Sequence, residues 1–160
     1  MSDDKRLEGV QIRFVSGAVP DDDIRLRGVW GRERLGRLFE MELLLSRASG
    51  PFTPGELDDL LHAPCVVGLG PRPKDKVHGL LERIELIDST RTVAARYLAK
   101  MVPNLWLLTL SRTNCVYQNM SIPDLVRAVL GRYGMVEGQH FELLVRRNEK
   151  SPVREHIVQY

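Results

Sequence analysis

Apolar and polar residues alternate with a period of two in the first part of the chain, which is the pattern of half-buried β-strands. Val10, Ile12 and Phe14 fall on one side of the first such segment. Ile24 and Leu26 repeat the pattern in the second, each followed by an arginine. One apolar and one polar face is typical of antiparallel sheets, so these segments predict strands with one face on a core.

The segment 38–45 has apolar residues on both faces, but one face is uniformly apolar. Phe39, Met41, Leu43 and Leu45 share that face, whereas two glutamates interrupt the other. The uniform face is therefore expected to point into the core. Turn-forming residues lie in two connections, at 17–23 between the first two strands and at 50–54 after this strand.

Two segments predict helices. Thr53 is a suitable N-cap, Pro54 fits the first helical position, and Leu57, Leu60 and Leu61 form a short stripe. The longer helix is expected over 122–133, with Ser121 as the cap, Asp124 in the first turn and Gly134 as the stop. Its apolar residues share one face, as expected for a helix that lies on a barrel or covers its edge.

Further strands are expected at 65–69, 77–87 and 93–102, and again at 141–146 and 153–158. Residues 88–91 carry turn chemistry between two long apolar runs, which predicts a long hairpin. Long hairpins suit a closed or nearly closed barrel. The fold class is therefore mainly β with minor α: an antiparallel β-barrel with a covering helix.

Composition places the chain among ordinary globular proteins. The chain is 43% hydrophobic and 28% charged, as soluble globular proteins are. Its length of 160 residues is sufficient for one main hydrophobic core with an appendage. The formal charge of +2 arises from 23 basic and 21 acidic residues spread along the chain, so no strong field favours nucleic acid or membrane as a partner. No apolar run reaches the length of a membrane span, and the acidic start lacks the apolar core of a signal peptide.

No group of residues predicts catalysis, a cofactor or a metal ion. The four histidines, His62, His78, His140 and His156, are isolated from one another and from cysteines. Cys65 and Cys115 form no paired motif and are expected to be small buried hydrophobes.

The carboxylates predict no catalytic pair, and the glycines predict no phosphate-binding loop. Glu82 and Glu85 lie three apart in an expected strand and would point to opposite faces. Gly68, Gly70 and Gly79 lack the spacing of a phosphate-binding loop and are expected at turns or bulges. We therefore expect a non-catalytic protein.

Basic residues in two segments are candidates for a protein-contact surface, on composition only. One segment is the arginine-rich stretch 25–37, and the other is the loop 70–76. The candidate interface residues are Arg25, Arg27, Arg32, Arg34, Arg37, Arg72, Lys74 and Lys76. A solvated surface has the same composition, and the lack of a nucleic-acid-binding motif argues against a phosphate-binding patch.

Several segments, taken in order, resemble the N-terminal hub region of the VgrG spike proteins of type VI secretion. This family belongs with the baseplate hubs of contractile phage tails, the late control protein D-like proteins. The matching segments are GRERLGRLF at 31–39, PFTP at 51–54, VHGL at 77–80, PNLWLL at 103–108, YQNMSIPDLV at 117–126 and REHIVQY at 154–160. PNLWLL is similar to a motif that closes a strand in the family. Cys115 and Val116 depart from the family, which commonly has arginine and isoleucine there.

The resemblance implies a tail-tube-like barrel at 1–110, followed at 111–160 by a helix-containing insertion and the first strands of a second hub subdomain. It implies a structural component of a contractile injection machine that docks on a hexameric tube protein and helps to deliver effectors. Implied partners are two further copies in a full-length homotrimer, baseplate proteins and effectors. For this fragment by itself, a monomer stays open. Assembly in the cytoplasm and export through the machine, to the extracellular space or a target cell, are also implied.

Three other functions stay open. A stand-alone adaptor or effector-binding domain with the same fold fits a chain that ends at Tyr160, where the family continues into further hub strands and a spike. An enzyme is considered because some family members carry catalytic C-terminal extensions. Nucleic-acid binding would require salt-sensitive retention of DNA, which the near-neutral charge disfavours.

Overall fold

The computed structural model describes residues 12–20, 22–90, 93–145 and 151–159. Its chain contacts define two compact units, Met1–Trp106 and Leu107–Tyr160, and each is described by itself. The assignment of 1–110 and 111–160 to separate hub subdomains stays a prediction.

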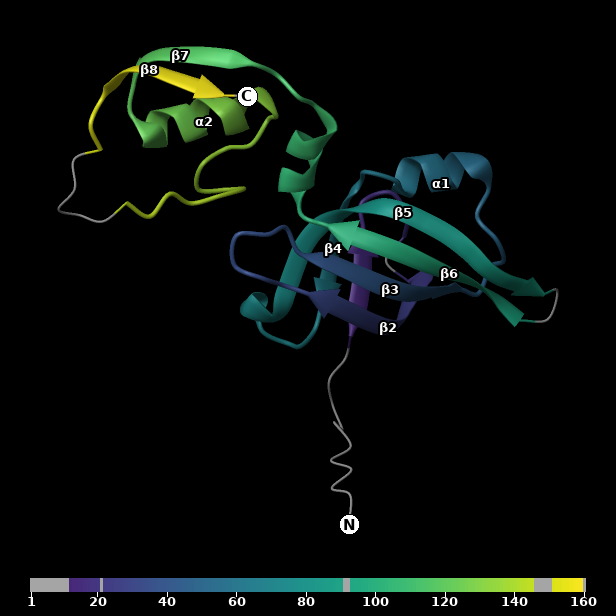
Figure 1. The fold of residues 1–160 in the computed structure, drawn as a ribbon. Helices are drawn as coiled ribbons and strands as arrows, with labels where there is room; N and C mark the ends of the chain where they lie inside the picture. Colours follow the sequence, from purple (N-terminus) through teal and green to yellow (C-terminus); the bar gives the residue numbers. More distant parts are fainter. Residues whose placement is uncertain (1–11, 21, 91–92, 146–150, 160) are drawn as a thin grey trace. The chain divides into compact units, whose positions relative to one another are not determined.

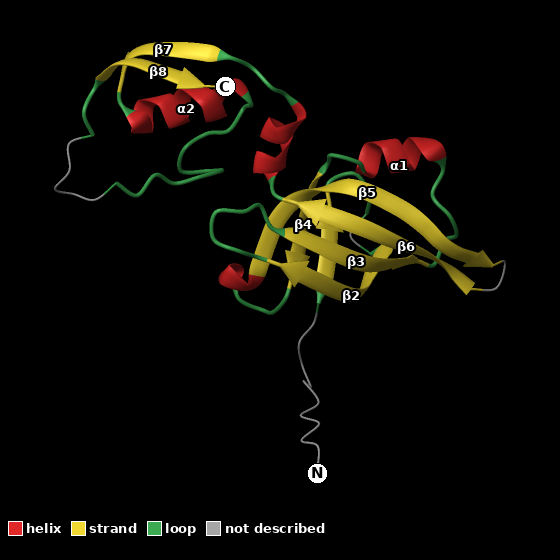
Figure 2. Ribbon diagram, in the orientation of Figure 1, coloured by secondary structure: helices red, strands yellow, loops and turns green. Residues whose placement is uncertain are grey.

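The first unit is built on one antiparallel six-stranded sheet in the order β1-β4-β5-β6-β3-β2 (Figure 1). Its strands are β1 (Arg13–Ser16), β2 (Ile24–Arg32), β3 (Glu40–Arg47), β4 (Pro64–Gly68), β5 (Lys76–Thr90) and β6 (Val93–Val102). The sheet curls so that its edge strands β1 and β2 approach each other, although within the described residues each is hydrogen-bonded on one side only. The expected antiparallel, nearly closed barrel is confirmed as a curled half-barrel (Figure 2).

Alternation along the strands places the apolar faces inside the curl. Phe14, Leu26, Leu43 and Leu45 are buried, as their sequence pattern predicts, and Tyr97 packs among them. Val10, also expected on this face, lies outside the described residues. A core of this size is sufficient to stabilise the barrel without a disulfide or metal.

Helix α1 (Pro54–Leu60) covers part of this core. Thr53 caps it: its side chain accepts a hydrogen bond from the backbone of Glu56, and the Glu56 side chain accepts one from the Thr53 backbone. Leu60 is fully buried and Leu57 packs against the core. The short helix η1 (Pro73–Asp75) lies in the loop between β4 and β5.

Gly79 occupies a strand position, so its expected place at a turn or bulge is wrong. It lies in β5 opposite Cys65 of β4, and a Cβ atom built on it would lie 2.3 Å from the Val102 carbonyl oxygen of β6. Only glycine therefore allows β6 to approach this closely.

The second unit contains a two-stranded sheet and a helix. Its elements are η2 (Asn104–Leu110), which begins at the end of the first unit, then β7 (Cys115–Met120), α2 (Ile122–Arg132) and β8 (Arg154–Gln159). The segment 103–108, whose motif closes a strand in the family, lies mainly in η2. Phe141 makes only an isolated bridge to Glu137, so the strand expected at 141–146 is wrong for residues 141–145; Arg146 lies outside the described residues.

Helix α2 begins and ends close to where the sequence predicts. The Ser121 side chain accepts a hydrogen bond from the Asp124 backbone, and Gly134 follows the helix with a φ of +72°. The helix belongs to the second unit, where it packs against β7. Its expected place on the barrel or at the barrel's edge stays a prediction. Within the first unit, the covering helix is α1. Amphipathic spacing identifies an apolar face but not the sheet that will cover it.

Among the helices of the described chain, none combines the length and the apolar character needed to cross a bilayer.

Candidate protein-interaction surface

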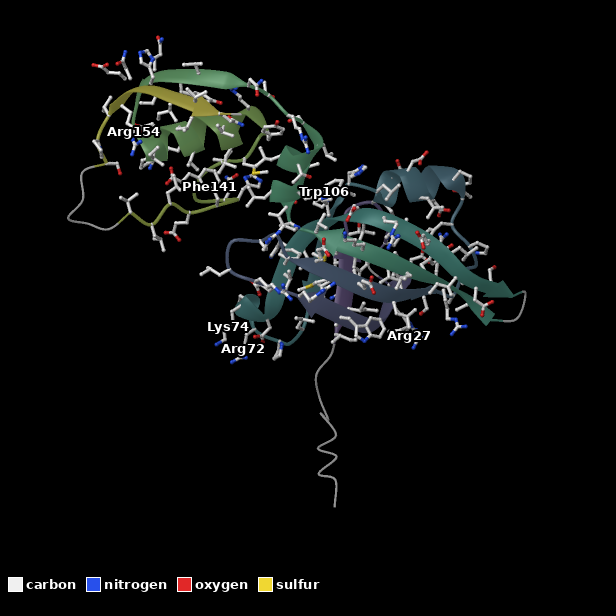
Figure 3. The ribbon with its side chains drawn as sticks, in the orientation of Figure 1. Arg27, Arg72, Lys74, Trp106, Phe141 and Arg154 are labelled. Carbon is white, nitrogen blue, oxygen red and sulfur yellow. The ribbon has the colours of Figure 1, made fainter. Side chains whose placement is uncertain are left out.

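The eight candidate interface residues do not form one surface. Arg25 and Arg27 lie in the first half of β2, whereas Arg32 is its last residue. Arg27 is the extra residue of a β-bulge, and its Nε donates a hydrogen bond of 2.8 Å to the hydroxyl of the buried Ser46. Figure 3 shows Arg27 well apart from Arg72. Arg27 therefore has a role in the sheet itself, which its place in an arginine-rich stretch does not indicate.

The other three arginines of this stretch come together. The loop from β2 to β3 turns at Gly36, whose φ is +73°, and the Arg37 backbone nitrogen donates to the Arg34 carbonyl oxygen at 3.1 Å. Arg32, Arg34 and Arg37 line one open hollow of about 330 Å³ together with Leu38 and Glu40. We call this the arginine hollow. In the described part of the chain, none of its three guanidinium groups takes part in an ion pair.

An apolar groove of about 450 Å³ adjoins the arginine hollow, and we call it the leucine groove. It is lined by residues 33–39 together with Pro103 and Leu105. Leu35 is fully exposed, with a relative accessibility of 106%, and Leu105 is 41% exposed. Sequence reasoning missed Leu35; the signal was an apolar residue next to glycine in a polar turn, which cannot reach a core.

The loop between β4 and β5 carries the remaining basic candidates. Arg72 pairs with Asp75 at 3.0 Å, and this hydrogen-bonded pairing lowers the pKa of the Asp75 carboxyl. Lys74 and Lys76 are exposed (Figure 3 labels Arg72 and Lys74). Because the sheet is antiparallel, this loop leaves the same strand end as the β2–β3 loop: β2 and β4 end there, and β3 and β5 begin there. That strand end is basic.

Glu82 and Glu85 lie on the same face of β5, so the expectation of opposite faces is wrong. A bulge between Leu81 and Arg83 shifts the alternation by one residue. Glu82 then lies 2.8 Å from the Lys100 ammonium, and Glu85 lies 3.2 Å from the Arg83 guanidinium. Each carboxylate already has a cation partner. Pairing with Glu82, and secondarily with Glu40, raises the pKa of Lys100.

Of the histidines and cysteines, one has a feature that the sequence did not indicate. His62 has a φ of +64° and its ring stacks on Trp106 with the centroids 6.0 Å apart. Cys65 is buried, as expected, and its burial raises the pKa of the thiol to about 12. Cys115 is only half-buried, so the expectation of burial is wrong for this residue. In the described ranges, no group of three or more His, Cys, Asp or Glu side chains could hold a metal ion.

The second unit has a pocket of its own, of about 460 Å³. The Arg132 guanidinium lies over the ring of Tyr117, 5.4 Å from its centroid, and donates to the Tyr117 hydroxyl at 3.4 Å. The same guanidinium donates a weak hydrogen bond to the Cys115 sulfur at 3.8 Å. This bond is the largest of the interactions that raise the pKa of Arg132. Helix α2 therefore contacts β7 through side-chain hydrogen bonds and a cation–π contact as well as through packing.

Residues 32–160 match the family model of the phage tail baseplate hub (GPD). Similar proteins include the type VI secretion system spike proteins VgrG4b, VgrG5 and VgrG1c of Pseudomonas aeruginosa, which are 28%, 30% and 33% identical over 86% of the chain. The chain spans only 16%, 17% and 18% of their lengths.

A solved structure has a similar fold. The c3393 protein of E. coli, a component of the type VI secretion system with structural similarity to the T4 bacteriophage tail proteins gp27 and gp5, superposes with a TM-score of 0.68. It is 24% identical, and the likeness covers 86% of this chain and 38% of that one. The residues matched by the family model include those that line the arginine hollow and the leucine groove. This chain belongs to the phage tail baseplate hub (GPD) family.

Proposed function

We propose that this chain acts as the first barrel of the spike hub in a contractile injection machine, docking on the hexameric tube protein and helping to deliver effectors. The observation that carries the proposal is the hub-family match over residues 32–160, on a curled barrel similar to a type VI secretion component. In the full-length context, the hub would be a homotrimer that also contacts baseplate proteins.

The strand end that carries the β2–β3 and β4–β5 loops is the proposed docking surface. It presents Arg32, Arg34 and Arg37 from one loop and Lys74 and Lys76 from the other. Basic side chains on a protein surface raise the rate of association with an acidic partner and fix its orientation. We do not assign Arg27 to this surface, because it is hydrogen-bonded to Ser46 within the sheet.

Contact rather than catalysis is the proposed mode of action. The carboxylates of β5 are paired with Lys100 and Arg83. The guanidinium groups that line the hollow stay protonated, so they can hold anionic groups but cannot serve as proton-transfer groups. Assembly in the cytoplasm and export through the machine belong to the same proposal.

Binding to purified hexamers of the tube protein of the same secretion system tests the proposal in solution. In cells, deletion of the gene is expected to stop release of the tube protein into the medium, and reintroduction of the gene is expected to restore it. Absence of binding together with normal release from the deletion strain would refute a hub role. Turnover of a substrate by the purified chain would refute the non-catalytic part.

A further inference from the structure

The arginine hollow and the leucine groove share residues and form one continuous two-part site. Arg34, Arg37 and Leu38 line both parts. We propose that this site binds an acidic segment of a partner protein, with a carboxylate in the arginine hollow and a neighbouring apolar side chain in the leucine groove. The inference rests on the proposed function, in which the partner is the tube ring.

Charge in the hollow favours a carboxylate. Glu40 is the acidic residue of the hollow, but it already pairs with the Lys100 ammonium at 3.2 Å. Lys100 also pairs with Glu82, so the charge of Glu40 still counts. Three arginines against two glutamates, Glu33 and Glu40, leave a local charge of +1. Guanidinium groups bind carboxylates through two parallel hydrogen bonds, which gives orientation as well as attraction.

Apolar contact is expected next to this charge. A single exposed leucine is ordinary on a protein surface. Here, however, Leu35, Leu38 and Leu105 line the same groove, and Leu35 has its whole side chain in solvent. A cluster of exposed leucines bordered by cations is typical of a binding surface whose apolar centre is enclosed by a polar rim.

The backbone holds the site in place before binding. Arg32 and Glu40 face each other in the β2–β3 ladder and close the base of the loop. The hydrogen bond between residues 34 and 37 and the left-handed backbone at Gly36 fix its tip. A loop ordered in advance loses less conformational entropy when it binds.

Biolayer interferometry of the 160-residue chain on immobilised tube-protein hexamers tests the inference. The variants are Leu35→Asp and Arg34→Glu, and the matched controls are Leu144→Asp and Arg112→Glu, which are exposed residues of the second unit outside both parts of the site. Leu35→Asp is expected to weaken binding about thirtyfold, the size of an interface hot spot. Arg34→Glu is expected to slow association about tenfold at low salt, and less at high salt.

Photocrosslinking identifies which residues of the partner contact the site. p-Benzoylphenylalanine placed at position 35 is expected to crosslink to the tube protein at an apolar residue that has aspartate or glutamate nearby in the fold. A crosslink to a basic segment, or to a second copy of this chain, would overturn the inference.

The two proposals fail in different ways. If the unaltered chain binds the ring and both site variants bind within about twofold of it, as expected for a neutral surface change, the two-part site is refuted and the hub role stands. If the unaltered chain does not bind the ring, docking is refuted and the inference falls with it. Near-ultraviolet circular dichroism identical to that of the unaltered chain establishes that each variant is folded.

Discussion

Arg47, the last residue of β3, forms a bidentate ion pair with Glu56 in the first turn of α1. Its Nη2 and Nη1 atoms lie 2.6 and 3.2 Å from the two carboxylate oxygens. The same guanidinium pairs with Asp23 at 2.7 Å and lies 4.2 Å from the centroid of the Phe52 ring. One side chain therefore joins the start of β2, the end of β3 and the covering helix.

This network predicts acid sensitivity of the barrel. The hydrogen bonds from Arg47, and secondarily those from Thr53, lower the pKa of Glu56 from 4.5 to about 2. Because the pKa is lower in the folded state, the stabilisation is present above pH 4.5 and is lost as the pH falls towards about 2. Glu56 is 35% exposed, so solvent screening limits the size of the effect.

The measurement is a series of thermal melts of the unaltered chain and of Glu56→Gln, from neutral pH down to a pH of about 2. The difference in Tm is expected to be largest near neutral pH and to shrink as the pH falls. A Tm difference that stays constant with pH would contradict the assignment. Asp58→Asn, an exposed carboxylate of the same helix, is the control.

Replacement of Gly79 by alanine is expected to destabilise the barrel. The added Cβ would lie 2.3 Å from the Val102 carbonyl oxygen, so β5 and β6 must separate locally. Overpacking of this kind typically costs about 1–3 kcal/mol. Urea unfolding followed by tryptophan fluorescence measures the loss. Gly55→Ala in α1, where the Cβ would meet open space, is the control and is expected to leave stability unchanged or raised.

Removal of the Tyr97 hydroxyl is expected to destabilise the core although no carbon atom is lost. The Phe52 backbone nitrogen donates to this hydroxyl at 2.6 Å in a buried setting, and the two rings are 5.0 Å apart. Tyr97→Phe leaves the buried N–H without its acceptor, which costs about 1–3 kcal/mol. Urea unfolding measures this loss as well, with Tyr133→Phe in the second unit as the control. An unchanged free energy of unfolding would contradict this prediction.

The two thiols are expected to react at very different rates. Cys65 is 2% exposed and its pKa is raised to about 12 by burial, so it is both inaccessible and protonated at neutral pH. Cys115 is half-buried on the wall of the second-unit pocket. Titration with Ellman's reagent at pH 8 is expected to label Cys115 in the folded chain and Cys65 only after denaturation. Rapid labelling of folded Cys115→Ser would contradict the burial of Cys65.

Local patterns in the sequence were sufficient for most secondary structure. The period-two alternation around Ile24 and Leu43 placed core faces correctly, and Thr53 and Ser121 marked helix starts that the structure retains. These signals succeed because hydrogen-bond caps and face alternation depend on neighbours only a few residues away. The ordered motifs likewise identified the hub family, which the family match confirms.

Tertiary structure decided what depends on distant strands. The bulge before Arg83 put Glu82 and Glu85 on one face, and the close approach of β6 required glycine at position 79. Neither has a local sequence signal, because both arise from the register between strands. For the same reason only the fold separated Arg27 from the other arginines, whereas the turn at Gly36 gathered Arg32, Arg34 and Arg37 beside Leu35.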